Sequence, residues 1–367
     1  MLPPLQQIPP DVVAVADYEP LARERLSAAV WAYLNGGAAD EITLRENRAA
    51  FERLRVNGRV LADLSNANTR VTLFGNTFPF PFLLSAIAYQ KLLHPDGEFA
   101  TVLGAAAAKA GMVVSTQATV MLEDLARQAQ TPLWFQLYVQ PDRGFTRELV
   151  QRAECAGYAA LVVTVDTPIL GPRNRQQRVG FSLPPGIEPV NLRGLAPSRR
   201  RTFPGEADEA LIFNSLLDAS LTWKDIGWLL SLTKLPVILK GVMTPSDAAR
   251  AVEAGVAGIV VSNHGGRNLD TLPATIDVLP AIAEKVAGRI PLLLDGGIRR
   301  GTDVLKALAL GANAVLLGRP YAHGLAAAGA IGVAHVVNIL RAELEAAMAL
   351  TGCANLGQID RSVIWRG

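Results

Sequence analysis

The 367-residue sequence predicts one α/β domain, a (β/α)8 or TIM barrel, with an N-terminal helical extension over residues 1–78 and a long loop insertion over residues 181–222 after the fourth strand. Three observations lead to this prediction. Short apolar runs alternate with helical patterns, there are eight such runs, and polar residues end each of them. Strands buried on both faces are continuously apolar, and eight strand–helix units can close a barrel. An open doubly wound sheet is the alternative.

Each expected strand is a short apolar run, often rich in β-branched residues. The runs are Phe80–Ala86, Met112–Thr116, Leu133–Val139, Ala160–Val165, Pro236–Lys240, Gly258–Ser262, Pro291–Leu294 and Ala314–Leu317. Helices are expected at Thr146–Ala156, at Pro245–Gly255, where Thr244 is the N-cap, and in the extension around Leu21–Leu34. The insertion is rich in Pro, Gly, Arg and Ser, and we expect it to form a lid over the active face.

The composition argues against several classes of function. Lys plus Arg number 35 and Asp plus Glu 33, so the net charge of +2 does not suggest a nucleic-acid partner. Cys155 and Cys353 form no C-x-x-C motif, and no metal site is expected. No apolar run approaches the roughly 18 residues of a membrane helix. Residues 1–10 lack the layout of a signal peptide, so we expect a cytoplasmic protein without membrane association.

Polar side chains follow the apolar runs at all eight predicted strand ends. In a barrel these C-terminal ends form one rim, and the active site is built there. Polar groups at such positions cost desolvation free energy unless they are paired or face a ligand. The residues are Ser85–Gln90, Ser115–Gln117, Gln136–Tyr138, Thr164–Asp166, Lys240–Gly241, Ser262–Arg267, Asp295–Arg299 and Gly318–Arg319.

The last two strand ends predict a phosphate site. Asp295-Gly296-Gly297 and Gly318-Arg319 follow the seventh and eighth strands, where barrels commonly bind phosphate. Glycines allow close approach of the backbone, helix N-termini offer free N–H groups, and Arg299 and Arg319 add charged donors. The glycines alone could simply form tight turns. Together with the arginines they indicate a phosphate-bearing cofactor.

A candidate base and its partners lie at other strand ends. His264 lies in a glycine-flanked turn, and a neutral imidazole is the natural base near pH 7, although a turn histidine can also be purely structural. Asp166 could orient this base, Arg267 could hold a carboxylate, and Lys240 could neutralise negative charge on a cofactor. Two phenol donors complete the set, Tyr138 and Tyr33, although Tyr33 could equally be a packing residue of its helix.

These motifs resemble those of the FMN-dependent L-2-hydroxy-acid oxidase family, which includes glycolate oxidase, lactate oxidase, and mandelate and lactate dehydrogenases. The resemblance extends over almost the whole chain, from Val30–Tyr33 to Gly352-Cys353. Its most specific segments are Phe135–Tyr138, Lys240–Val242, Ser262–Arg267 and Leu294–Asp303.

The resemblance implies FMN as the cofactor and assigns roles to individual residues. His264 would be the base, Asp166 its orienting partner, and Tyr138 a donor to the substrate oxygen. Lys240 would stabilise the reduced cofactor. The substrate carboxylate would be held by Arg267, Arg173 and Tyr33. The ring and ribityl part of FMN would contact Ala86, Ile87, Ala88, Ser115, Gln136, Thr164 and Ser262. The ribityl–phosphate end would contact Asp295, Gly297, Arg299, Gly318 and Arg319.

The sequence departs from the family pattern at several positions. Gln117 stands where glycolate oxidases carry a large aromatic residue, so strict glycolate specificity is not expected. Asn268 replaces the usual Gln after Arg267. The remaining departures are Ala86 and Ile87 in place of Pro-Thr, and Ile169 and Pro172 in place of basic residues.

The resemblance implies oxidation of an L-2-hydroxy acid to the 2-oxo acid, with O2 as the acceptor and H2O2 as the product. Ala88 resembles the oxidases, because some dehydrogenases have Gly there. Charged residues from Glu188 to Glu209 interrupt the apolar stretches of the insertion, which disfavours a membrane-linked enzyme. The alternatives are a quinone-linked dehydrogenase, an FMN-dependent isomerase on the same barrel, and a flavin-storage protein. A homo-oligomer, by family analogy a tetramer, is expected.

Overall fold

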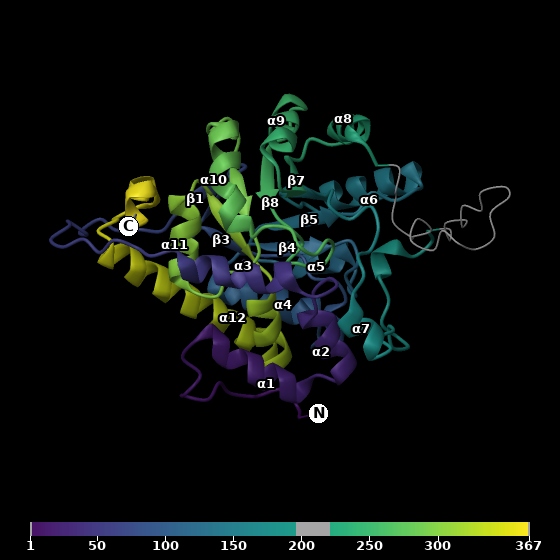
Figure 1. Ribbon diagram of the computed structural model, residues 1–367. Coiled ribbons are helices and arrows are strands. Elements are labelled where there is room, and N and C mark those ends of the chain that lie inside the picture. The colour runs from purple at the N-terminus through teal and green to yellow at the C-terminus, as the bar shows by residue number, and fades with distance from the viewer. Residues whose placement is uncertain (1, 196–220, 366–367) are drawn as a thin grey trace.

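The computed structural model describes residues 2–195 and 221–365, and within them eight parallel strands close a barrel in the order β10-β3-β4-β5-β6-β7-β8-β9 (Figure 1). The expected closed barrel is therefore present, and the open sheet is ruled out. The barrel strands are β3 (Phe82–Leu84), β4 (Met112–Ser115), β5 (Leu133–Leu137), β6 (Ala160–Thr164), β7 (Val237–Val242), β8 (Gly258–Val261), β9 (Leu292–Leu294) and β10 (Ala314–Leu317).

Helices follow the strands and surround the barrel (Figure 1). They are α4 (Glu98–Ala108), α5 (Leu122–Gln128), α6 (Arg143–Cys155), α8 (Trp223–Leu232), α9 (Pro245–Glu253), α10 (Thr275–Val286), α11 (Gly301–Ala309) and α12 (Arg319–Leu350). Helix α9 begins as predicted, because Thr244 accepts a hydrogen bond from the backbone of Asp247. Helix α6 begins earlier than predicted, because the Asp142 side chain caps its first turn.

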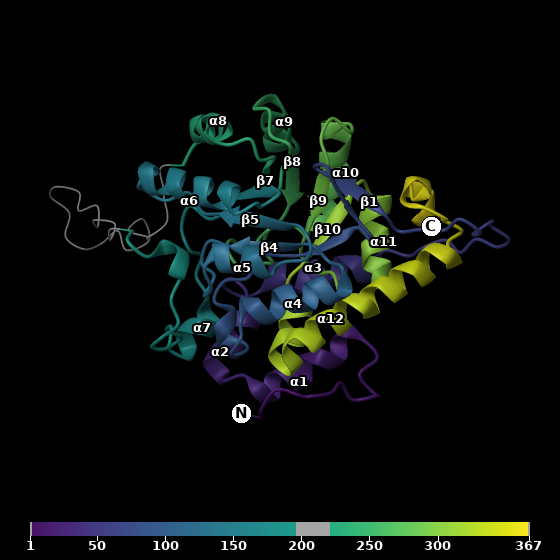
Figure 2. The same ribbon diagram turned by 180° about the vertical axis from the view of Figure 1, so that it is seen from behind.

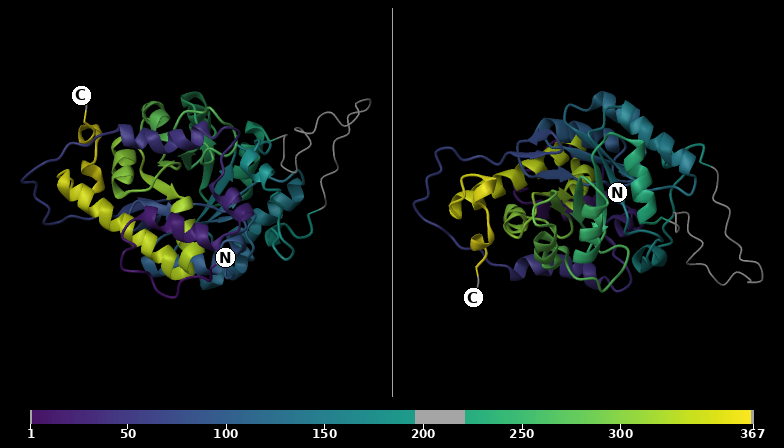
Figure 3. Two further views of the ribbon diagram at one scale, coloured as in Figure 1. Left: turned by 60° about the horizontal axis from the view of Figure 1, so that its bottom comes forward. Right: turned by 90° about the horizontal axis from the view of Figure 1, so that it is seen from above.

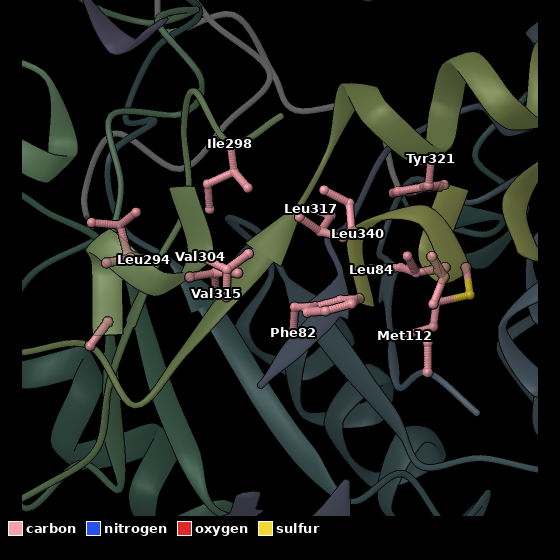
Figure 4. Close-up of a cluster of buried hydrophobic side chains, with 14 of the residues drawn as sticks. Phe82, Leu84, Met112, Leu294, Ile298, Val304, Val315, Leu317, Tyr321 and Leu340 are labelled. Atoms are coloured by element: carbon pink, nitrogen blue, oxygen red, sulfur yellow. The ribbon is translucent and has the colours of Figure 1, made fainter. Parts of the chain in front are cut away.

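Alternating strand residues divide the apolar side chains between two cores. One set fills the barrel interior, including Leu83, Val113, Trp134 and Ile238. The other lies between the strands and the surrounding helices, and Figure 4 shows part of it around β3, β10 and α12. Because successive strand side chains point to opposite faces, strands buried on both faces must be apolar at every position, which explains the continuous apolar runs.

The N-terminal extension contains three helices and a β-hairpin rather than the one expected helix. The helices are α1 (Tyr18–Arg25), α2 (Ala28–Asn35) and α3 (Ile42–Arg53). The expected helix over Leu21–Leu34 is wrong, because Leu26 is extended and Ser27 caps a new helix by accepting from the Val30 backbone. In Figure 3, α1 lies beside α12, which it contacts.

The hairpin of β1 (Val71–Leu73) and β2 (Asn76–Phe78) closes the N-terminal end of the barrel. Phe74 and Phe78 pack edge-on against Trp134, with ring centroids 5.4 and 6.2 Å away. Gly258, the first residue of β8, leaves room for this plug, since a Cβ atom there would lie 2.7 Å from the Phe74 ring. The sequence showed no barrel pattern here, so this role was missed.

Helix α12 is the one helix in the described part of the chain that is long and apolar enough to cross a membrane, by length and composition alone. This was not expected from the sequence. Figure 2 shows it beside α4, with which it makes extensive contacts, as it does with α11. It is also kinked at Ala328 and Gly329, whose backbone angles are not helical. These features are typical of a core helix that packs on the outside of a barrel.

The insertion is described only at its two ends. Residues 181–195 include the short helical turn Val190–Leu192, and residues 221–222 lead into α8. Residues 196–220 lie outside the described part of the chain, so the expected lid concerns mainly residues that the structure does not describe.

Candidate active site

A cavity of about 420 Å³ opens at the C-terminal ends of the barrel strands. Nearly all of the predicted site residues line it, although they are far apart in sequence. They are Tyr33, Ala86, Ile87, Ala88, Ser115, Gln136, Tyr138, Thr164, Arg173, Lys240, His264, Arg267, Asp295, Gly297, Arg299, Gly318 and Arg319. The two exceptions, Asp166 and Ser262, do not line the cavity, but each is hydrogen-bonded to a residue that does. Asp166 is bonded to His264, and Ser262 accepts from Lys240. Direct contact of Ser262 with a cofactor is therefore not favoured.

The wall formed by β4, β5 and β6 carries a ladder of polar side chains. The Ser115 hydroxyl donates to Gln136 Oε1 over 3.2 Å, and Gln136 Nε2 donates to the Thr164 hydroxyl over 2.9 Å. All three residues are more than nine-tenths buried. The ladder fixes the orientation of the Gln136 amide, and so presents a rigid polar surface to the cavity.

Among the described residues, Lys240 is the only lysine that lines the cavity, and it lies between acidic groups. Its Nζ atom is 2.8 Å from Asp295 Oδ2 and donates to the Ser262 hydroxyl over 2.8 Å. Burial acts to lower the pKa of Lys240, but the Asp295 and Asp166 carboxylates outweigh it and raise the pKa above its ordinary value. The side chain is therefore a fixed positive charge at neutral pH.

A bulge at Gly241 makes room for Asp166. The register of β7 shifts between Lys240 and Val242, and Gly241 has φ +113°, a conformation that favours glycine. A Cβ atom at this position would lie 2.5 Å from the Cβ atom of Asp166. The Lys240-Gly241 pair thus places the lysine in the cavity wall and leaves space for the acid behind it.

His264 and Asp166 form the predicted base and partner. His264 Nδ1 lies 2.9 Å from Asp166 Oδ1, and a carboxylate can only accept, so Nδ1 carries the proton and Nε2 is free to act as a base. Nε2 lies 3.4 Å from the Tyr138 hydroxyl. Burial acts to raise the pKa of Asp166, but His264 and Lys240 lower it below its ordinary value, so the acid is ionised at neutral pH.

The His264 turn is held by helix α3. Its backbone has φ +58°, which is uncommon for a residue with a side chain. Asn263, its neighbour, exchanges two side-chain hydrogen bonds with Asn47 of α3, each 2.8 Å long, and both residues are buried. No local signal in the sequence indicates Asn47, because its partner lies more than 200 residues away.

Arg267, Arg173 and Tyr33 lie next to one another in the cavity wall, and Arg173 Nε donates to the Arg267 carbonyl over 3.4 Å. The Arg267 guanidinium donates to the carbonyls of Tyr33 and Gly36 over 2.7 and 2.9 Å, at the C-terminal end of α2, and its Cζ atom lies 5.4 Å from the centroid of the Tyr33 ring. Burial, together with the nearby Arg173, lowers the pKa of Arg267 to about 10. Two cations placed this closely favour the binding of an anion such as a carboxylate.

Arg299 and Arg319 form a second pair of arginines in the cavity wall, and Arg319 shares the Gly36 carbonyl with Arg267. Arg319 donates to the carbonyls of Leu34, Gly36 and Gly265, and Arg299 donates to the carbonyl of Ile298. Within the described residues neither forms an ion pair with a carboxylate. Burial, followed by repulsion from Arg267 and Arg299, lowers the pKa of Arg319.

The part of the cavity lined by Arg299, Arg319 and Asp295 fits the phosphate and ribityl parts of FMN. The uncompensated arginine charges call for an anion, and Asp295 Oδ1 is a buried acceptor with no partner among the described residues. Gly297 is required for packing, since a Cβ atom there would lie 1.9 Å from the Asn47 carbonyl. Asp295 and the two arginines would therefore hold the cofactor between them.

Some lining residues had no role assigned from the sequence. Six of them lie within the predicted strand ends, namely Ser85, Tyr89, Gln117, Gly265, Gly296 and Ile298. Outside those strand ends the cavity is also lined by Leu34, Leu170, Gln176, Phe181, Leu183 and Leu316. Phe181 stacks on Tyr33 with ring centroids 4.9 Å apart, which ties the start of the insertion to α2. Phe181 and Leu183 belong to the insertion that was expected to cover the active face, but neither residue was singled out from the sequence.

Comparison with known proteins agrees with this geometry. A model of FMN-dependent dehydrogenases matches residues 22–366. An L-lactate oxidase of Nostoc sp. (strain PCC 7120 / SAG 25.82 / UTEX 2576) is 49% identical over 352 residues, which cover 95% of this chain and 96% of the relative. A peroxisomal (S)-2-hydroxy-acid oxidase of Oryza sativa subsp. japonica is 47% identical and covers 95% of each chain.

Solved structures of mandelate oxidase have the same fold. A variant with (S)-mandelic acid and the enzyme with benzoyl-formic acid each superpose with a TM-score of 0.87 at 40% identity, over 96% of this chain and 98% of theirs. The family match and these relatives extend over the whole barrel, including every strand end that lines the cavity. The chain therefore belongs to the FMN-dependent dehydrogenase family.

Proposed function

We propose that this protein oxidises an L-2-hydroxy acid to the 2-oxo acid with FMN as its cofactor, and that O2 is the electron acceptor and becomes H2O2. The observation that carries the proposal is the presence of an Asp166-oriented imidazole and two arginines in the wall of one cavity. A base beside a carboxylate-binding pair suits a 2-hydroxy acid, whose carboxylate and hydroxyl-bearing carbon are adjacent. Relatives named L-lactate oxidase and (S)-2-hydroxy-acid oxidase support the reaction.

The side chains of this chain bind and orient the substrate. Arg267 and Arg173 hold its carboxylate, and Tyr33 closes that side of the site. His264 Nε2 accepts one of the two protons that are lost on oxidation, because its other nitrogen is bonded to Asp166. When bound, FMN supplies the two-electron acceptor for this oxidation. Lys240 would place its positive charge next to the bound cofactor.

The relatives named as oxidases favour O2 over a membrane quinone as the acceptor, and Ala88 is a position at which the chain resembles oxidases. Ala88 lines the cavity, and its carbonyl accepts a hydrogen bond of 3.2 Å from the Tyr33 hydroxyl. The test is an assay of the FMN-loaded protein with a panel of L-2-hydroxy acids, in which 2-oxo acid and H2O2 are both measured. We expect one H2O2 per 2-oxo acid in air-saturated buffer. Turnover that needs an added quinone would support the dehydrogenase, and no flavin reduction by any hydroxy acid would leave the isomerase or storage alternatives.

We further propose that the chain forms a homo-oligomer, as the family resemblance leads us to expect, and that it acts in the cytoplasm, as the sequence leads us to expect. Light scattering on the FMN-loaded protein measures the mass directly. A mass of four chains of 39.1 kDa each supports the tetramer, and a monomer would contradict it.

A further inference from the structure

Two residues outside the predicted site extend the His264–Asp166 pair into a longer hydrogen-bonded chain. Asn268 Nδ2 lies 2.6 Å from the Thr167 hydroxyl oxygen, and Thr167 Oγ1 lies 3.0 Å from Asp166 Oδ1. Thr167 Oγ1 is also 3.2 Å from His264 Nδ1. Asn268 is one of the positions at which the sequence departs from the family pattern, and the proposed function leaves it without a role.

The direction of each hydrogen bond in this chain follows from its donors and acceptors. Asn268 Nδ2 lies 3.0 Å from the backbone carbonyl of Asp166, which can only accept, and this fixes the orientation of the amide. The second Nδ2 proton then points to Thr167 Oγ1. Because Thr167 accepts from Asn268, its own proton is free to point to Asp166 Oδ1.

The two carboxylate oxygens of Asp166 consequently differ. Oδ1 faces two donors, the Thr167 hydroxyl and His264 Nδ1. Oδ2 is buried and has no partner among the described residues, and it lies next to the bulge at Gly241, where a Cβ atom would be 2.9 Å away. Thr167 therefore competes with His264 for the one oxygen through which Asp166 acts on the imidazole.

We propose that Thr167 and Asn268 are positioning residues that fix the orientation of the Asp166 carboxylate. Because Thr167 shares the Oδ1 atom with His264, the two residues weaken the hydrogen bond between Asp166 and the proton on His264 Nδ1. Asn268 acts by orienting the Thr167 hydroxyl, and Thr167 acts by withdrawing charge from Oδ1. The proposal rests on the proposed function, because it concerns the base of that reaction.

The other groups around this pair are charged or phenolic and stay the same in the test. Tyr138, which follows β5, faces His264 Nε2, and Lys240 acts on Asp166 from β7. Arg173 and Arg267 line the same cavity. Of these groups, Asp166 is the one that is hydrogen-bonded to His264 Nδ1. Removal of the Thr167 hydroxyl should therefore strengthen the interaction between Asp166 Oδ1 and His264.

The test is the pH profile of flavin reduction by a good substrate in the FMN-loaded protein. Thr167→Val should move the midpoint of the acidic limb upward by roughly half to one pH unit, which is the size expected for one neutral hydrogen bond. Thr167→Ser keeps the hydroxyl and should restore the parent profile. Thr72→Val is a matched control, because its hydroxyl is also hydrogen-bonded, to Thr77, but lies on the hairpin at the far end of the barrel.

Asn268→Ala provides an independent variant if Thr167→Val does not fold. This variant leaves the Thr167 hydroxyl in place but free to rotate, so the midpoint of the acidic limb should move upward by less than in Thr167→Val. The variant that carries both substitutions should shift the midpoint no further than Thr167→Val alone. A Thr167→Val profile that superimposes on the parent, or one shifted to lower pH, would overturn the proposal. A parent protein whose flavin no hydroxy acid reduces would instead refute the proposed function.

Discussion

His264 is the residue on which the chemistry of the site depends. Its Nδ1 atom is bonded to Asp166 and its Nε2 atom is directed toward the Tyr138 hydroxyl, so only one nitrogen can accept a proton. We expect His264→Ala to keep FMN but to slow flavin reduction by about 10²–10⁴-fold, the usual contribution of a positioned base. His335→Ala is the control, since His335 bonds to Tyr18 away from the cavity. Stopped-flow absorbance measures the rate, and a near-parent rate in His264→Ala would remove this residue from the mechanism.

A substitution at Gly241 tests whether the rate of flavin reduction depends on the position of the Asp166 carboxylate. Gly241→Ala would place a Cβ atom 2.5 Å from that of Asp166, at a φ of +113°. Gly255→Ala is a matched control, because Gly255 also has a positive φ, +83°, but a Cβ atom added there would meet nothing within 4 Å.

Both glycine variants should lose stability, by about 1 kcal/mol from the backbone alone. Only Gly241→Ala should also reduce the rate of flavin reduction, because it displaces the partner of the base. Chemical unfolding and stopped-flow measurements separate the two effects. Equal reduction rates in the two variants would show that the bulge does not position Asp166.

At the scale of elements, the β1–β2 hairpin stabilises the barrel without contributing to the cavity. Phe78 is 1% exposed and packs against Trp134 at the N-terminal end. Phe78→Ala should lower the free energy of unfolding by about 3–5 kcal/mol, as other large truncations in cores do. Val60→Ala, at a position that is 87% exposed, should change it by less than about 0.5 kcal/mol. Urea unfolding measures the free energy of unfolding of both variants. A loss in Phe78→Ala as small as that in Val60→Ala would contradict the stabilising role of the hairpin.

The barrel strands could be predicted from sequence because each carries its own local signal. A run such as Ala160–Thr164 is apolar at every position because it is buried on both faces. The break between α1 and α2 was missed because apolar residues continue through Leu26, whereas the break depends on the Ser27 cap. The hairpin was missed because its Phe residues pack against Trp134, which is distant in sequence. The spacing of apolar residues within the hairpin does not reveal such a contact.

The site was predictable for the same reason that the strands were, because a barrel brings all strand ends to one rim. Residues such as Lys240 and His264 follow their strands directly, and so their positions could be inferred. Asn47 and Phe181 come from α3 and from the insertion, and their places depend on tertiary packing alone. Thr167 was missed for a different reason. It follows Asp166 directly in the sequence, but its proposed effect on His264 is indirect, through its hydrogen bond to Asp166.

At the scale of the whole molecule, buried histidines predict how stability depends on pH. Burial, followed by the charges of Arg299 and Arg319, lowers the pKa of His323 to about 3, and burial also lowers the pKa of His94 and His335. The unfolded chain therefore binds protons that the folded chain does not, and stability should fall as the pH drops below about 6.5.

His323→Gln isolates the largest of these contributions. His323 Nε2 lies 2.8 Å from Asn35 Oδ1, and a glutamine can still donate there but does not titrate. The melting temperature of the variant should depend less on pH between about 6.5 and 4 than that of the parent. Both are measured without FMN, because a bound phosphate would offset the two arginine charges. Parallel curves would contradict the assignment of a neutral, buried His323.

The most direct test of the proposed oxidation is anaerobic mixing of the FMN-loaded protein with L-lactate and, separately, with D-lactate, while the flavin absorbance is followed. We expect that the L-acid bleaches the flavin within the dead time or over seconds, that 2-oxo acid appears in equal amount, and that the D-acid has no effect. Arg267→Lys should need more L-acid for the same rate, because the lysine cannot replace the guanidinium fork. A flavin that stays oxidised with L-lactate and every other L-2-hydroxy acid would contradict the proposed oxidation.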